Sequence, residues 1–236
     1  MPAKRKSLPR KAKSVLRKLT PLLQKTTDLL LKEIASNPSI LERHLTEKIA
    51  FLHAQGNVGA QNSGNKPTDQ EASFATVAEK HGFMFLSKTA PAPENGCYYL
   101  YQLKGTQQDG DFCLREYVEG EVASELIIDL KHTQSKAFYL NDGWFQKGVI
   151  YIVSWNKGTK KKPDLKAYIA FGEDIPSEEE QALMATLNAF KLAKNTGEKK
   201  IGSLIPYVRF ANKYTCERFT DETSKVHLEK VLVALE

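Results

Sequence analysis

Two aspartates and a lysine in the middle of this 236-residue chain, Asp111, Asp129 and Lys131, have side chains that can act together on a phosphate ester. Two carboxylates within a few ångströms of each other repel unless a divalent cation lies between them, and Mg²⁺ binds proteins through such oxygens. A lysine beside that cation places a positive charge near a phosphate or an attacking water. If the fold brings the three together, their chemistry is that of a metal-dependent phosphodiesterase.

The segment between these residues predicts how they are positioned. Two extended runs, Asp111–Val118 and Val122–Lys131, flank the polar Glu119-Gly120-Glu121, and glycine favours a turn that needs positive φ. In an antiparallel hairpin centred near Gly120, position 111 lies opposite position 129. Opposed residues point to the same face, as do residues i and i+2, so the three side chains converge on one face of a sheet. A solvated hairpin that carries Asp and Lys outward is the alternative.

This pattern resembles the PD-(D/E)xK nuclease superfamily, and within it the type II restriction endonucleases of the EcoRV-like branch. Ile127-Ile128 leads into Asp129-Leu130-Lys131-His132-Thr133 as in that family's second motif, and Val77–Phe83 resembles the end of the helix before the catalytic sheet. Gly110 stands where the family's usual Pro precedes the first Asp. The resemblance covers about residues 68–156, and so short a motif needs structural context.

The resemblance implies a type II restriction endonuclease, an enzyme that hydrolyses phosphodiester bonds in double-stranded DNA at a specific short sequence. Asp111, Asp129 and Lys131 would be catalytic, and Asp111, Asp129 and the backbone carbonyl of Leu130 would bind Mg²⁺. A homodimer with one site per subunit, and a separately encoded methyltransferase acting on the same site, are also implied. A structure-specific repair or junction nuclease of the same superfamily, and a non-catalytic DNA-binding protein, are the alternatives.

Family members often carry a glutamate on the helix before the sheet that joins or supports the metal site. Glu71 and Glu79 are the candidates here, because helix spacing places them two turns apart on a similar face. Glu71 is also suited to a purely structural role as the third residue of a capping box that begins at Thr68. Glu79 can equally be a solvated neighbour of Lys80. Glu71 is therefore an additional candidate metal ligand.

Candidate DNA contacts follow the second catalytic segment. Gln134, Lys136 and Asn141 lie around a turn just after Lys131, and Asn and Gln side chains can read adenine edges. A loop with buried aromatic residues is the alternative. Residues 1–18 hold eight Lys or Arg and no acid, while the whole chain carries +6, so residues 19–236 together carry −2. This basic tail either neutralises DNA phosphates or only solubilises the protein.

The predicted fold class is α/β, a mixed β-sheet core flanked by helices as in restriction endonucleases, with an N-terminal helical arm. The basic tail at 1–18 is followed by the arm at 19–55, a Gly- and Asn-rich linker at 56–67, and a nuclease domain at 68–236 whose catalytic core spans about 68–156. We expect Pro21 to interrupt or kink the arm and a second helix to run from Ser39 to about Ala54. The apolar stripe of the arm needs a surface to pack against, which is either the catalytic domain or a second subunit. The arm would serve in dimerisation or in clamping DNA.

The composition of the chain predicts where in the cell the protein is located. The chain is 41% hydrophobic, enough for a core, but no apolar run is long enough to span a membrane and the basic start lacks the apolar segment of a secretory signal. Three cysteines without CxxC spacing cannot all pair, and they indicate free thiols in a reducing compartment. The cytoplasm is the expected location, with no membrane partner.

Overall fold

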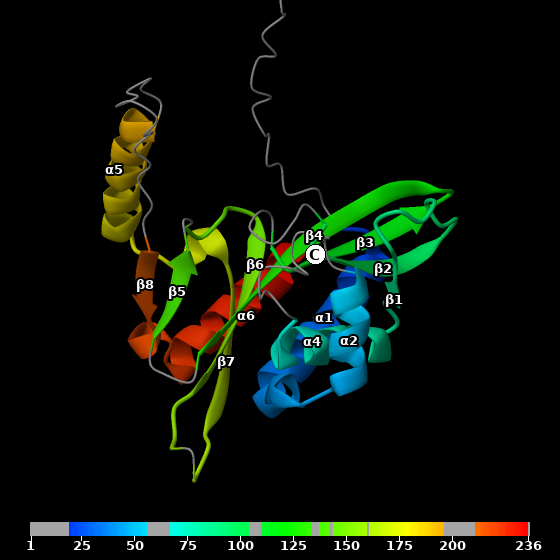
Figure 1. The fold of residues 1–236 in the computed structure, drawn as a ribbon, viewed down its shortest axis with the longest axis horizontal. Helices are drawn as coiled ribbons and strands as arrows, with labels where there is room; N and C mark the ends of the chain where they lie inside the picture. The colour runs from blue at the N-terminus through cyan, green and yellow to red at the C-terminus, as the bar shows by residue number, and fades with distance from the viewer. Residues whose placement is uncertain are drawn as a thin grey trace, which may run out of the picture.

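The protein is built around a six-stranded mixed β-sheet (Figure 1). The computed structural model describes residues 19–55, 67–103, 110–133, 137–141, 144–159, 161–195 and 211–235. The strands lie in the order β1-β2-β3-β4-β6-β7, with β1–β2 and β4–β6 parallel and the other neighbours antiparallel. Their bounds are β1 Met84–Phe85, β2 Gly96–Tyr101, β3 Phe112–Val118, β4 Glu121–Thr133, β6 Val149–Asn156 and β7 Leu165–Phe171. With the helices described below, this sheet confirms the predicted α/β class.

The β3–β4 hairpin has the predicted register, but the register results from a shorter turn than expected combined with a β-bulge. Its loop is two residues long, Glu119 with φ 53° and Gly120 with φ 78°, and two successive positive φ values are typical of a type I′ hairpin turn. Such a turn alone would shift the pairing by one residue. A bulge beside Glu116 and Tyr117 restores it, so that Phe112 pairs with Ile128, the last pair of the ladder before Asp111.

Helices from both ends of the chain cover one face of the sheet. The N-terminal arm consists of α1 Pro21–Ser36, the 3₁₀ helix η1 Pro38–Glu42 and α2 Thr46–Gln55, and it is joined there by α4 Asp69–Lys80 and α6 Asp221–Leu235. Pro21 begins α1 instead of kinking it, and the α-helix expected from Ser39 begins only at Thr46. The core under these helices contains Leu23, Leu30, Leu31, Ile34, Leu41, Leu52, Phe74, Phe112, Ile128 and Ile152. Of the two partner surfaces left open by the sequence, the arm therefore covers the main sheet of the same chain.

The opposite face of the sheet carries an aromatic cluster beneath a small second sheet. β5 Ala137–Asn141 pairs antiparallel with β8 Ala211–Thr215, followed by the 3₁₀ helix η3 Cys216–Arg218. The Phe219 ring stacks on Tyr168 of β7 with centroids 4.0 Å apart. Figure 1 shows this β5–β8 pair on the other side of the main sheet from α1, α2 and α4. The cluster includes Phe138, Phe145, Tyr151, Val153, Trp155, Tyr168, Tyr214 and Phe219.

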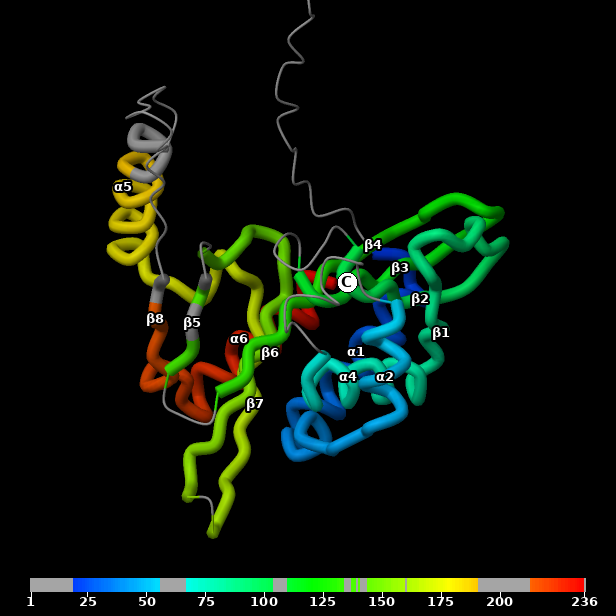
Figure 2. Tube along the Cα trace, in the orientation of Figure 1, coloured from blue at the N-terminus to red at the C-terminus, as the bar shows by residue number. Residues whose placement is uncertain are grey.

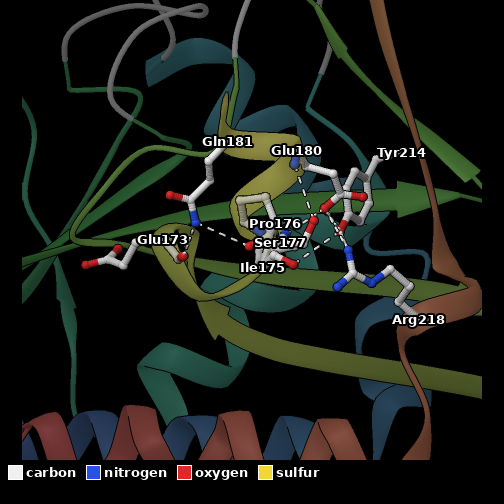
Figure 3. A network of polar contacts seen from close by, with 8 residues as sticks. All are labelled: Glu173, Ile175, Pro176, Ser177, Glu180, Gln181, Tyr214 and Arg218. Carbon is white, nitrogen blue, oxygen red and sulfur yellow. Dashed lines mark hydrogen bonds and ion pairs between the residues drawn. The ribbon is translucent and has the colours of Figure 1, made fainter. Parts of the chain in front are cut away.

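Helix α5, Glu178–Asn195, extends away from the main sheet (Figure 2). It follows β7 and the 3₁₀ helix η2, Gly172–Asp174. Ser177 and Glu180 form a capping box at its start. The Glu180 carboxylate also binds Arg218 at 2.7 Å, which fixes this end of α5 to the segment after β8 (Figure 3).

Two further features concern the cysteines and the question of membrane-spanning helices. Cys97, Cys113 and Cys216 are buried and form no disulfide, as expected, and burial raises the pKa of the Cys97 and Cys216 thiols to about 11. Thiols with so high a pKa are poor nucleophiles, so neither Cys97 nor Cys216 is a candidate for catalysis. Within the described ranges, the helices are too short or too polar for any of them to traverse a bilayer.

Candidate active site

The structure brings Asp111, Asp129 and Lys131 together at the edge where β3 begins. The Asp111 N–H donates at 2.9 Å to the carbonyl of Ile128, the residue that pairs with Phe112, so Asp111 is held against β4 just before β3 begins. The Leu130 N–H donates to Asp111 Oδ2 at 2.7 Å, and Lys131 Nζ forms an ion pair with Asp129 Oδ1. The predicted convergence is therefore confirmed as geometry. The carboxylates lie on the face of the aromatic cluster, beside Tyr151, which pairs with Asp129 across β4 and β6.

Gly110 stands before the first Asp because its backbone has a conformation that proline cannot adopt. Its φ is +76°, whereas the proline ring holds φ near −65°. A Cβ atom at this position would lie 2.6 Å from Ile127 Cγ2 and 2.7 Å from the Ile128 carbonyl oxygen. The chain thus turns tightly against β4 immediately before Asp111, and only glycine allows that approach.

Gly110→Ala is expected to destabilise the protein by about 3 kcal/mol or more, since it adds a backbone clash to the cost of positive φ. Gly120→Ala is the matched control, because Gly120 has φ +78° but open space where the Cβ would be. That change should cost only about 1–2 kcal/mol. Urea unfolding followed by circular dichroism measures both losses. Equal losses would show that the close approach at Gly110 carries no energetic weight.

The site holds more negative charge than its surroundings neutralise. Burial, followed by the charges of Asp129 and Glu71, raises the pKa of Asp111 to about 8, against the opposing effects of the Lys131 ammonium and the Leu130 N–H. Burial also raises the pKa of Asp129, against Lys131. For Lys131, burial acts to lower the pKa, but Asp129, Asp111 and Glu71 outweigh it and the pKa is raised. Lys131 is therefore a permanent cation, but its single positive charge does not neutralise the negative charges of both aspartates.

Glu71 lies close enough to act on this site while it also caps a helix. The predicted capping box is present: the Thr68 hydroxyl accepts from the Glu71 N–H at 3.2 Å, and the Thr68 N–H donates to Glu71 Oε2 at 2.6 Å. Glu71 Oε1 accepts a hydrogen bond from the Tyr101 hydroxyl at 2.9 Å. The side chain is buried, and its charge contributes to the raised pKa of both Asp111 and Lys131.

Glu79, the other helix candidate, belongs to a different cluster. Both of its carboxylate oxygens bind Lys48 Nζ of α2 at 2.7 Å, and one also accepts from the Tyr99 hydroxyl at 2.7 Å. These contacts tie α2 and α4 to β2. Nothing in the geometry connects Glu79 to the carboxylate pair, so of the two glutamates only Glu71 stays a candidate.

The donor set suits one hard divalent cation. Three carboxylates, buried Glu71 and half-buried Asp111 and Asp129, face a single ammonium, Lys131, which leaves a charge of −2 when all are ionised. The N–H and C=O of a strand residue point to the same edge, so the Leu130 carbonyl, like its N–H, faces Asp111 beyond the start of β3. No three His, Cys, Asp or Glu side chains within the described ranges are grouped closely enough to hold a metal by themselves. A cation here would therefore rely on the two aspartates together with neutral oxygens.

The candidate DNA contacts are only partly covered by the structure. Gln134 and Lys136 fall outside the described residues. Asn141 ends β5, where its backbone pairs with Ala211 of β8. Their contacts with DNA stay predictions.

Sequence analysis missed Tyr101, Gln102 and Tyr151, all of which lie around the carboxylates. Tyr101 bonds Glu71, Gln102 bonds the Asp111 backbone, and the Asp129 and Asp111 charges add to the effect of burial in raising the pKa of Tyr151. These residues belong to no motif. Only the register of β2 and β6 against the predicted hairpin would have placed them here.

Comparisons with protein-family models, curated proteins and solved structures give no significant match to this chain. Function is therefore argued from the chemistry of this site and from the resemblance of its motif.

Proposed function

We propose that this protein is a Mg²⁺-dependent endodeoxyribonuclease that hydrolyses phosphodiester bonds. The observation that carries the proposal is the pairing of two half-buried aspartates, Asp111 and Asp129, with a permanently charged Lys131 at the start of β3. Two carboxylates held close together and largely shielded from water repel each other, and a divalent cation bound between them removes that repulsion.

Each residue has a distinct task in this mechanism. Asp111, Asp129 and the Leu130 carbonyl would hold Mg²⁺, which supplies Lewis acidity toward the phosphate oxygens when it is bound. The Leu130 N–H holds Asp111 Oδ2, so that the carboxylate is already oriented. Because its pKa is raised, Lys131 stays protonated near neutral pH, and it stabilises the negative charge that develops on the phosphate instead of accepting a proton. Asp129, as its ion-pair partner, keeps that ammonium in position.

The finer assignment rests on the resemblance. We propose double-stranded DNA as the substrate, a specific short sequence as the target, and a homodimer that presents one site to each strand, since two-fold sites and two-fold dimers match geometrically. A methyltransferase acting on the same sequence would be encoded separately. In this proposal the basic residues 1–18 contribute salt-dependent contacts to DNA phosphates.

Digestion of defined DNA substrates tests the proposal. Purified protein is incubated with phage DNA, plasmid and a four-way junction, with Mg²⁺ or with EDTA. Discrete fragments of phage DNA that require Mg²⁺ are expected, and sequencing their ends would give the target. Cutting of the junction alone would identify a structure-specific nuclease. DNA that is bound yet intact with Mg²⁺ and Mn²⁺ would overturn the nuclease proposal in favour of a DNA-binding protein.

A further inference from the structure

Gln102 adopts an unfavourable conformation directly beside the carboxylate pair. Gln102 follows β2 and has φ +48°, a left-handed backbone conformation that is uncommon outside glycine. The residue is only 7% exposed to solvent. Its N–H donates to the Asp111 carbonyl at 2.8 Å, so its backbone is held against the first catalytic residue. Strain and burial of this kind persist where surrounding structure imposes them, and they often mark functional positions.

The hydrogen bonds around Gln102 decide which way its side-chain amide faces. The Tyr101 hydroxyl has one proton, which it donates to Glu71 Oε1 at 2.9 Å. It must therefore accept from Gln102, whose Nε2 lies 2.9 Å away. Gln102 Oε1 then points away from Tyr101, and this buried oxygen has no hydrogen-bond partner within the described part of the chain. A buried amide oxygen without a partner is costly, which indicates that something else satisfies it.

The β2–β3 register and the contacts of Asp111 bring Gln102 close to the aspartate pair. Tyr101 pairs with Phe112, so position 102 comes opposite position 111, and Asp111 Oδ2 accepts from the N–H of Leu130, the residue after Asp129. We propose that Gln102 Oε1 is an additional ligand of the divalent cation that Asp111 and Asp129 would hold. This inference rests on the proposed function. An amide oxygen suits a hard cation, and because it is neutral it completes the coordination without adding negative charge to the three carboxylates of the site.

Two substitutions separate a ligand from a structural support. Gln102→Met keeps the length of the side chain but removes both the oxygen and the donor to Tyr101. Gln102→Glu keeps an oxygen but likewise loses the donor to Tyr101. A role that consists only of supporting Tyr101 would be lost equally in both variants. A role as cation ligand is lost only in Gln102→Met.

The readout is Mn²⁺ binding to the full chain without DNA, measured from the free-ion signal in electron paramagnetic resonance. Gln102→Met should weaken Mn²⁺ binding at least about tenfold, whereas Gln102→Glu should bind as tightly as the wild type or more tightly. Gln70→Met is the control for loss of a buried amide, because Gln70 contacts Ser154 Oγ and the Lys131 carbonyl from the helix-covered face. Its Mn²⁺ affinity should stay within about twofold of the wild type. Circular dichroism would verify that each variant is folded.

The outcomes distinguish this inference from the proposed function. Wild-type binding that Asp129→Asn abolishes, together with unchanged binding in Gln102→Met, would overturn the role of Gln102 and leave the metal site standing. Equal weakening in Gln102→Met and Gln102→Glu would assign Gln102 to the support of Tyr101 and also overturn it. Absence of any Mn²⁺ binding by the wild type would overturn the metal site itself.

Discussion

Asp129→Asn is expected to abolish Mg²⁺-dependent DNA cleavage, with a rate loss of roughly 10³-fold or more, because a metal contribution of several kcal/mol to the transition state disappears. The substitution keeps the shape of the side chain but removes one of the two charges that hold the cation. It also removes the ion-pair partner of Lys131, whose ammonium loses its fixed position. Both consequences slow the hydrolysis of the phosphodiester bond. Single-turnover cleavage of labelled DNA measures the loss.

Glu79→Gln is the matched control for this experiment. Glu79 is also a carboxylate near the sheet, but it binds Lys48 and the Tyr99 hydroxyl and has no contact with the aspartate pair. Its substitution should reduce stability modestly and leave the cleavage rate per folded molecule within about threefold of the wild type. Comparable rate losses in Asp129→Asn and Glu79→Gln would mean that cleavage depends on the fold in general and not on the aspartate pair.

In the absence of divalent cations, the protein is expected to become less stable as the pH rises from about 4 to about 8. In the folded protein the pKa of Asp111 is raised to about 8, first by burial and then by Asp129 and Glu71, whereas in the unfolded chain it lies near 4. Between these values the folded state binds more protons, so the free energy of unfolding falls with increasing pH. The contribution is complete below about pH 4 and is lost as the pH rises through about 8. Asp129, whose pKa is also raised, acts in the same direction.

A bound cation should reverse this trend, because it neutralises the ionised pair. Mg²⁺ is therefore expected to raise the melting temperature more at pH 8 than at pH 5. At pH 8 in EDTA, Asp129→Asn should melt higher than the wild type by about 2–4 °C for each kcal/mol of repulsion removed. Thermal melts by circular dichroism at both pH values, with Mg²⁺ and with EDTA, provide the four conditions. A wild type that Mg²⁺ stabilises equally at pH 5 and pH 8 would contradict the assigned charge state.

The hairpin could be predicted because its signals are local. Alternating extended runs and a glycine turn lie within 21 residues, and they predict the register in which Phe112 pairs with Ile128, even though the turn is shorter than expected and a bulge compensates for it. The capping box at Thr68 and Glu71 is equally local, since both partners lie within one helical turn. Secondary structure and the three motif residues were therefore accessible from short-range patterns.

Other parts of the site depend on contacts between distant segments. Gln102 lies beside Asp111 only through the β2–β3 register, and its positive φ has no signal in the sequence. β8 pairs with β5 across more than seventy residues, as Phe138 with Tyr214 shows, and no local pattern indicates such a partner. Apolar spacing predicted the helices of the arm, but not which surface they cover. Strand pairing between distant segments is thus the feature that could not be predicted from the sequence alone.

The dependence of the cleavage rate on Mg²⁺ concentration, measured at pH 8 for the wild type and for Asp111→Asn, tests the central claim most directly. If Asp111 and Asp129 together hold the catalytic cation, the wild-type rate rises with Mg²⁺ to a plateau and is zero in EDTA, while Asp111→Asn shows no cleavage at any concentration. Wild-type cleavage that persists in EDTA, or an Asp111→Asn variant with the wild-type Mg²⁺ curve, would contradict the assignment of this site.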